Sequence, residues 1–129
     1  MADIALLILR LCLGIMFMAH GMQKLFGFFD GPGIKGFAQY LTGIGFAPAI
    51  LWAYVTGCTE LLGGLLLVLG LFTRGAAAWL VMFMVIAIVK VHLSKGFFSQ
   101  NGGFEYPLII ASVCIALVLM GPGKFAVMK

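Results

Sequence analysis

Charge is scarce in this sequence, and its scarcity excludes a soluble globular domain. Charged residues make up 9% of the 129 residues, whereas an ordinary soluble domain carries about 25%. Hydrophobic residues make up 64%, and the mean hydropathy is +1.19. The formal net charge of +4 is too modest to indicate nucleic acid as a partner. We therefore expect residues 1–129 to form one polytopic membrane domain that leaves little chain for an aqueous part.

Cysteine is also scarce, and the sequence contains no CxxC motif. Each of the three cysteines, Cys12, Cys58 and Cys114, lies inside an apolar run, where a thiol usually behaves as a small hydrophobic group. A redox pair would need two Cα atoms within about 7 Å, and spacing alone leaves that alternative open. The chain also lacks a basic segment before its first apolar run, so we expect no cleavable signal peptide.

Four apolar segments dominate the sequence. About 20 apolar residues, at 1.5 Å of helical rise each, cover a hydrocarbon core of roughly 30 Å. We predict membrane spans at about residues 4–26, 49–72, 75–93 and 105–120. An even number of spans puts both chain termini on the same side of the membrane. The predicted fold class is therefore all-α, a polytopic membrane four-helix bundle.

The segment between the first two spans, residues 27–47, is rich in glycine and contains Pro32. It is too short and too broken to cross a membrane. Ile34, Phe37, Ala38 and Leu41 recur at roughly helical spacing, which is typical of an amphipathic helix. We predict a short interfacial or re-entrant helix between spans 1 and 2, and the alternative is a plain loop.

A single acidic residue, Glu60, lies near the middle of the second predicted span. A charge at the bilayer centre costs about 3 kcal/mol or more, so Glu60 should face the bundle and have a partner. Small residues three or four positions away lie on the same face and allow a neighbouring helix to come close. Arg10 of the first span is expected at a depth that lets it meet Glu60 if the two spans are neighbours. We therefore predict a structural ion pair between Arg10 and Glu60.

Polar side chains gather at the ends of the spans that lie away from the termini. His20 and Lys24 come late in the first span, His92 ends the third, and Glu105 begins the fourth. Together with Glu60, these four residues form the predicted ligand-binding site. Aromatic residues distributed along the chain could supply its walls, namely Phe17, Phe26, Phe28, Phe29, Trp52, Tyr54, Phe97 and Tyr106.

Three interpretations of these polar residues stay open. The first is structural: buried pairs that fix helix register, beside an aromatic belt with cations that extend to the membrane interface. The second is a pocket for an amphipathic ring such as a quinone, whose reduction consumes protons that His and Glu side chains can relay. The third is a haem or metal site with His20 and His92 as axial ligands. No second motif supports the third, so we predict no metal site and do not expect haem.

Several spaced motifs follow one another along the chain. They are Arg10-x3-Gly14, His20-Gly21-x2-Lys24-Leu25, Glu60-x2-Gly63-Gly64-x5-Gly70-x3-Arg74, His92-x3-Gly96-Phe97, Glu105 and Gly121-Pro122-Gly123. Their order and spacing, over nearly the whole chain, resembles the DoxX family of small four-helix membrane proteins. That family is named for a subunit of an archaeal thiosulfate:quinone oxidoreductase. Other members are linked to redox and oxidative-stress complexes, and distant relatives act as membrane chaperones or cargo receptors.

The resemblance implies a function as well as a fold. The leading hypothesis is a small integral membrane subunit of a redox system, a quinone-linked oxidoreductase, that binds a quinone-like hydrophobic ligand in a polar intramembrane groove. The alternative is a non-enzymatic membrane scaffold, chaperone or assembly factor. Whether this chain itself catalyses a reaction is left open by the sequence.

Localisation and partners follow from the same reasoning. We expect a multi-pass protein of the cell membrane, in a bacterial or archaeal inner membrane, with both termini on one side. The basic residues of the predicted loops are balanced between the two sides, so the positive-inside rule does not orient the chain; the family resemblance implies cytoplasmic termini. The expected partners are the lipid bilayer, a redox partner protein and further copies of the chain, but not nucleic acid.

Overall fold

The computed structural model describes residues 1–128, and all the regular structure in them is helical. The five α-helices are α1 (Ala2–Phe26), α2 (Gly33–Gly43), α3 (Ala49–Leu69), α4 (Thr73–Ala87) and α5 (Glu105–Met120). Helix α4 continues into a π-helical turn, Ile88–His92, and then into a short 3₁₀ helix, Leu93–Lys95; another 3₁₀ helix covers Ser99–Asn101. The predicted all-α class of a polytopic membrane protein is confirmed, including the short helix between the first two spans.

Helix length and composition agree with a membrane protein. Helix α1, helix α3 and the continuous helical segment Thr73–Lys95 have 25, 21 and 23 residues and are apolar enough to cross a bilayer. Helix α5 is also apolar but has 16 residues, which is slightly short for a crossing perpendicular to the membrane. Four crossings, and the position of α2 at the membrane surface or within it, stay predictions.

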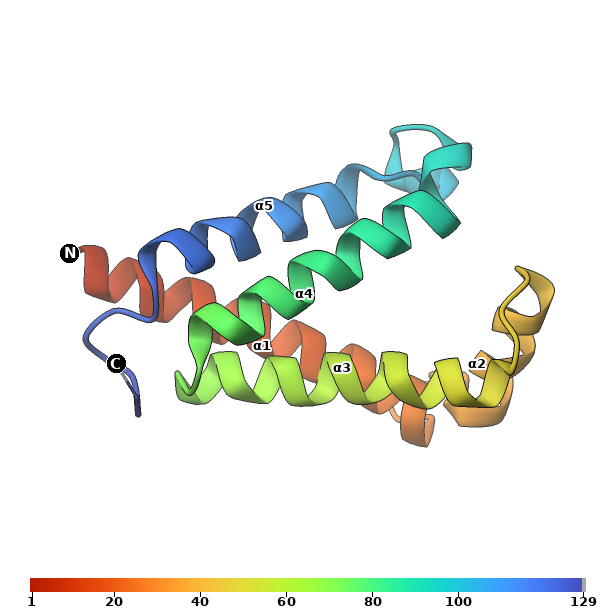
Figure 1. Ribbon diagram of the computed structural model, residues 1–129, viewed down its shortest axis with the longest axis horizontal. Helices are drawn as coiled ribbons and strands as arrows, with labels where there is room; N and C mark the ends of the chain where they lie inside the picture. The colour runs from red at the N-terminus through yellow and green to blue at the C-terminus, as the bar shows by residue number, and fades with distance from the viewer. Residues whose placement is uncertain (129) are drawn as a thin grey trace.

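The long helices form two antiparallel pairs. Helix α1 lies beside α3, and α4 lies beside α5. The pairs meet at the end of the molecule that carries both termini and diverge toward the other end, where α2 packs against α1 and α3 (Figure 1). Leu67, Leu80 and Leu117, one from each of three helices, are fully buried between the pairs. Phe37, Leu41 and Ala53 form a smaller core that attaches α2 to α3.

Glycines bring the backbones of α1 and α3 into contact. A Cβ atom added to Gly14 would lie 2.6 Å from the carbonyl oxygen of Gly64, and one added to Gly21 would lie 2.7 Å from the backbone nitrogen of Leu61. Close approach at small residues is a common way for membrane helices to associate. These contacts fix the register of the antiparallel pair: residue 14 of α1 lies between residues 64 and 68 of α3, and residue 21 lies between residues 57 and 61.

Arg10 is fully buried at the end of α3 that lies near the chain termini. Its Nη1 donates to the carbonyl oxygen of Leu67 at 3.1 Å, and its Nη2 donates to the carbonyl oxygen of Phe125. The last carbonyls of a helix lack intrahelical partners and carry partial negative charge, so this helix end can accept a cation without a carboxylate. Arg10 therefore joins α3 to the C-terminal segment, which also donates from Val127 N–H to Leu69 O at 3.0 Å.

Candidate functional site

Glu60 forms a salt bridge with Lys24, not with Arg10. The side chain of Glu60 is 4% exposed and that of Lys24 is 23% exposed, so the pair lies largely inside the protein. The predicted Arg10–Glu60 pair is wrong because of the register of α1 and α3. The carbonyl that binds Arg10 is seven residues from Glu60, or about 10 Å along the helix, and Lys24 reaches Glu60 from the opposite direction.

A cavity of about 250 Å³ opens beside this salt bridge. Four of the five predicted ligand-binding residues line it: His20 and Lys24 from α1, Glu60 from α3, and His92 at the end of the π-helical turn. The remaining lining residues are mainly aromatic and apolar, and come from α1, α4 and α5: Met16, Phe17, Phe83, Met84, Ala87, Tyr106, Pro107 and Ile110. The convergence of His20, Lys24 and His92 expected from the sequence therefore occurs, and Glu60 joins them.

The imidazole of His92 is held in one orientation by the loop that follows it. Its Nδ1 lies 2.7 Å from the carbonyl oxygen of Gly102, and because a carbonyl can only accept, Nδ1 must carry the proton. In the neutral ring, Nε2 is then the acceptor nitrogen. The π-helical turn Ile88–His92 supplies this residue, and such turns occur frequently at functional sites.

A second cavity, of about 330 Å³, adjoins the first at Lys24 and His92, which line both. It lies between α2, α3 and α4, and five aromatic residues give it a largely apolar wall: Phe37, Tyr40, Phe46, Trp52 and Phe83. The Lys24 ammonium lies 4.9 Å from the ring centroid of Phe37 and 5.8 Å from that of Phe83. Both distances permit cation–π attraction, so the aromatic rings and Glu60 together surround the Lys24 charge.

Glu105 lines neither cavity, so the structure does not bring it together with the other four predicted site residues; its part in ligand binding stays a prediction. Its carboxylate accepts a hydrogen bond from the Ser99 N–H at 2.9 Å. The acid thus turns toward the loop before α5 and ties the short 3₁₀ helix to the start of α5. A free N–H at the start of a helix is a common partner for a carboxylate, and the Ser99 N–H competes with the cavity for this side chain.

Three of the eight aromatic residues that were proposed as walls of the site line a cavity. Phe17 and Tyr106 line the first cavity and Trp52 lines the second, whereas the other proposed aromatic walls, Phe26, Phe28, Phe29, Tyr54 and Phe97, line neither. Sequence reasoning missed Phe83, which borders both cavities. It also missed Phe37 as a cavity residue, although the helical spacing of residues 34, 37, 38 and 41 had already placed Phe37 on the apolar face of a helix.

Comparison with known proteins identifies the family of the chain. The family model described as DoxX matches residues 5–93. A Bacillus subtilis protein named "Putative oxidoreductase CatD" is 36% identical over 115 residues, which cover 89% of this chain and 79% of that protein. The "Uncharacterized membrane protein Rv3486" of Mycobacterium tuberculosis is 32% identical over 128 residues, covering 92% of this chain and 76% of that protein.

A third relative is the "Inner membrane protein YphA" of Escherichia coli. It is 26% identical over 131 residues, covering 95% of this chain and 87% of that protein. No solved structure was found to match the chain. The Mycobacterium tuberculosis and Escherichia coli relatives are membrane proteins by name, and the family model covers most of α1 through α4 and its continuation. The chain belongs to the DoxX family of membrane proteins.

Proposed function

We propose that this protein is a small integral membrane subunit of a quinone-linked redox system, and that the two adjoining cavities bind a quinone-like ligand. One observation carries the proposal: four ionisable side chains, His20, Lys24, Glu60 and His92, share a cavity with aromatic rings inside an otherwise apolar helical protein. Ionisable groups are costly within a membrane and are usually functional there. The name of the Bacillus subtilis relative, which includes the word oxidoreductase, supports a redox role.

The chemistry of a quinone matches the lining of the cavities. Its ring carbonyls accept hydrogen bonds, and the Lys24 ammonium and a protonated nitrogen of His20 can donate them. Its flat ring can pack against Phe83 or Tyr106, which line the first cavity. The second cavity, with more aromatic lining, suits the hydrophobic chain of the ligand. We assign the ring to the cavity beside Glu60 and the chain to the cavity beneath α2.

The proposed reaction must balance electrons and protons. Reduction of a quinone to a quinol takes up two electrons and two protons. The electrons come from a redox partner protein, which this proposal therefore requires. His20 and the Lys24–Glu60 pair are placed to pass one proton each to the two ring oxygens, because all three residues line the cavity assigned to the ring; in the pair Lys24 carries the proton, and protons from water replace the two that are given up.

A binding titration tests the proposal. We expect the purified protein in mild detergent to bind a soluble short-chain quinone analogue saturably, with quenching of Trp52 fluorescence as one readout. His20→Ala and His92→Ala should each weaken binding by roughly tenfold, because each removes one polar contact worth about 1–1.5 kcal/mol. Thermal stability should stay nearly unchanged for His20→Ala. Glu105→Gln is the matched control: this side chain begins α5 but lies outside the cavities, so affinity should not change.

Two results would contradict the proposal. One is the absence of saturable binding by the wild-type protein, and the other is unchanged affinity in both histidine variants. Either result would favour the alternative function, a membrane scaffold, chaperone or assembly factor. In that case the salt bridge and its aromatic surroundings would serve only to hold α1 and α3 together.

A further inference from the structure

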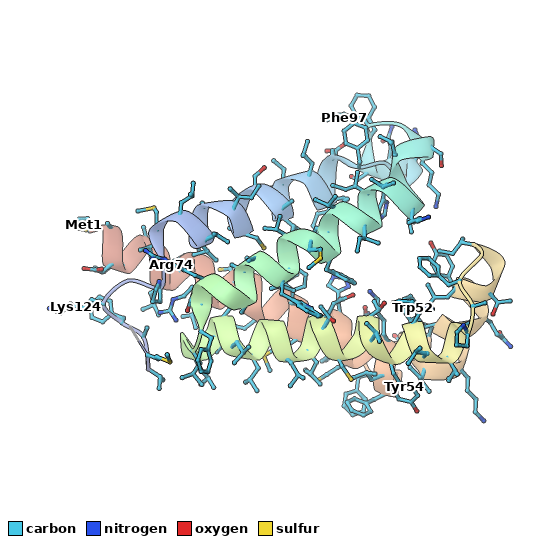
Figure 2. The ribbon with its side chains drawn as sticks, viewed as in Figure 1. Met1, Trp52, Tyr54, Arg74, Phe97 and Lys124 are labelled. Atoms are coloured by element: carbon cyan, nitrogen blue, oxygen red, sulfur yellow. The ribbon has the colours of Figure 1, made fainter. Side chains whose placement is uncertain are left out.

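A separate polar cavity lies at the start of α4, at the end of the molecule that carries both termini. Its volume is about 300 Å³, and its lining includes Phe72, Thr73, Arg74, Gly75 and Pro122. Figure 2 shows Arg74 at the end of the protein where Met1 and Lys124 lie, while Trp52, which lines the cavity assigned to a quinone chain, lies at the other end. This cavity shares no residue with the proposed quinone site.

Three features of this cavity favour a phosphate group. The Thr73 residue is 3% exposed, and its hydroxyl has no hydrogen-bond partner among residues 1–128; an unpaired buried hydroxyl is unfavourable. The first N–H groups of α4 lack intrahelical partners and attract anions. Arg74 is exposed. Within residues 1–128 the one salt bridge joins Lys24 to Glu60, so no carboxylate in this part of the chain pairs with Arg74. Its guanidinium is therefore available to an anion.

A long apolar groove continues from this cavity between α3 and α4. It has a volume of about 600 Å³ and shares Phe72 and Gly75 with the polar cavity. Along α3 its lining runs from Val55 to Leu66, about 16 Å at 1.5 Å per residue. That length is close to half of a roughly 30 Å hydrocarbon core, which is the depth of one leaflet and the reach of one acyl chain.

The groove has little polar surface to satisfy. Among the residues that line the groove, Thr59 carries a hydroxyl, and this hydroxyl already accepts a hydrogen bond from Trp79 Nε1 at 3.1 Å. The other lining residues are aliphatic, aromatic, glycine or cysteine. A hydrocarbon chain can therefore fill the groove without leaving a polar partner unmatched.

We propose that the polar cavity and the apolar groove together bind one anionic phospholipid of the leaflet on the side of the termini. The Thr73 hydroxyl, the first N–H groups of α4 and the Arg74 guanidinium hold the phosphate, and one acyl chain lies between α3 and α4. Arg74 sets the preference for a net negative headgroup such as that of phosphatidylglycerol, because the choline of phosphatidylcholine would bring a second cation near it. This inference is independent of the proposed quinone site.

Tryptophan fluorescence gives a direct test, because the chain has two tryptophans and Trp79 lines the groove. In a Trp52→Phe variant, Trp79 is the one fluorescent tryptophan. The protein is reconstituted in phosphatidylcholine bilayers in which a rising fraction of the lipid is phosphatidylglycerol with brominated acyl chains, which quench nearby tryptophan. The same series with brominated phosphatidylcholine gives the reference. From the quenching of Trp79 we expect the site to bind phosphatidylglycerol with an apparent affinity about fivefold higher than that for phosphatidylcholine. This ratio corresponds to about 1 kcal/mol, the effect of one cationic side chain near a headgroup.

Variants separate the site from general attraction to the membrane. Arg74→Gln should reduce the preference to near one, whereas Lys124→Gln, an exposed cation at the same end that lines neither cavity, should keep it. Soluble glycerol phosphate should not displace the brominated lipid, since it cannot fill the groove. Equal quenching by the two brominated lipids, an unchanged preference in Arg74→Gln, or displacement by glycerol phosphate would each overturn the proposal.

Discussion

Removing Lys24 is expected to destabilise the protein more than neutralising Glu60. Lys24→Met leaves the Glu60 carboxylate, 4% exposed, without its cation, and a stranded member of a buried pair costs about 3–5 kcal/mol. Glu60→Gln leaves Lys24, which is 23% exposed and still has an amide oxygen as acceptor. Its expected cost is about 1–2 kcal/mol, the loss of one charge-assisted contact.

The double variant measures the interaction itself. Lys24→Met combined with Glu60→Leu leaves no unpaired charge. The loss of unfolding free energy in this double variant should therefore be smaller than the sum of the losses in Lys24→Met alone and Glu60→Leu alone, by at least about 2 kcal/mol. Arg10→Leu combined with Glu60→Leu is the control. Arg10 donates to backbone carbonyls, one of them at Leu67, about 10 Å along α3 from Glu60. Its effect should therefore add to that of Glu60→Leu within about 0.5 kcal/mol.

The assay is reversible unfolding in mixed micelles of a mild detergent and sodium dodecyl sulfate, followed by circular dichroism. Free energies of unfolding for the wild type, three single and two double variants complete both cycles. A coupling below about 0.5 kcal/mol between Lys24 and Glu60 would refute the salt bridge. A coupling above about 1 kcal/mol between Arg10 and Glu60 would restore the pairing expected from sequence and contradict the register of α1 and α3.

Two further predictions concern packing and topology. Gly64→Ala should destabilise the protein by about 1–3 kcal/mol, because the new Cβ would lie 2.5 Å from the Gly14 carbonyl oxygen. Gly43→Ala is the control: a Cβ at this position meets nothing within 4 Å, so the change should cost under about 0.5 kcal/mol in the same unfolding assay. Single cysteines at Gly36 and Lys124, with the three native cysteines replaced, should react with an impermeant reagent from opposite sides of the membrane, because three of the four predicted spans separate these positions. Labelling of both positions from the same side would contradict the four predicted crossings.

Helix positions could be predicted from the sequence because apolar length and turn residues determine them locally. The fourth predicted span, residues 105–120, coincides with α5. The second span was predicted to reach residue 72, but α3 ends at Leu69 because Gly70 adopts a left-handed conformation with φ of 74°. There its N–H bonds to Leu66 O at 2.8 Å and the Leu71 N–H bonds to the same oxygen at 3.0 Å, an arrangement that glycine permits and that ends helices.

Partner choice within the bundle could not be predicted, because it depends on register and on segments far away in sequence. Depth along a helix made Arg10 a reasonable partner for Glu60, but the path of the C-terminal segment brings the Phe125 carbonyl to Arg10. That contact spans 115 residues, and no local pattern signals it. The position of Glu105 outside the cavities has a related cause: its N–H partner at Ser99 exists only once the loop before α5 has folded.

The salt bridge between Lys24 and Glu60 is better explained by the cavities than by stability. Replacing a buried ion pair with apolar residues of similar volume is often neutral or stabilising, and α1 and α3 already meet at Gly14 and Gly21. Both charges line the first cavity, where they would face the ring of a bound quinone. The double variant Lys24→Met with Glu60→Leu should therefore keep most of the stability and lose binding of the quinone analogue. Retained binding in that variant would assign the pair to helix packing alone.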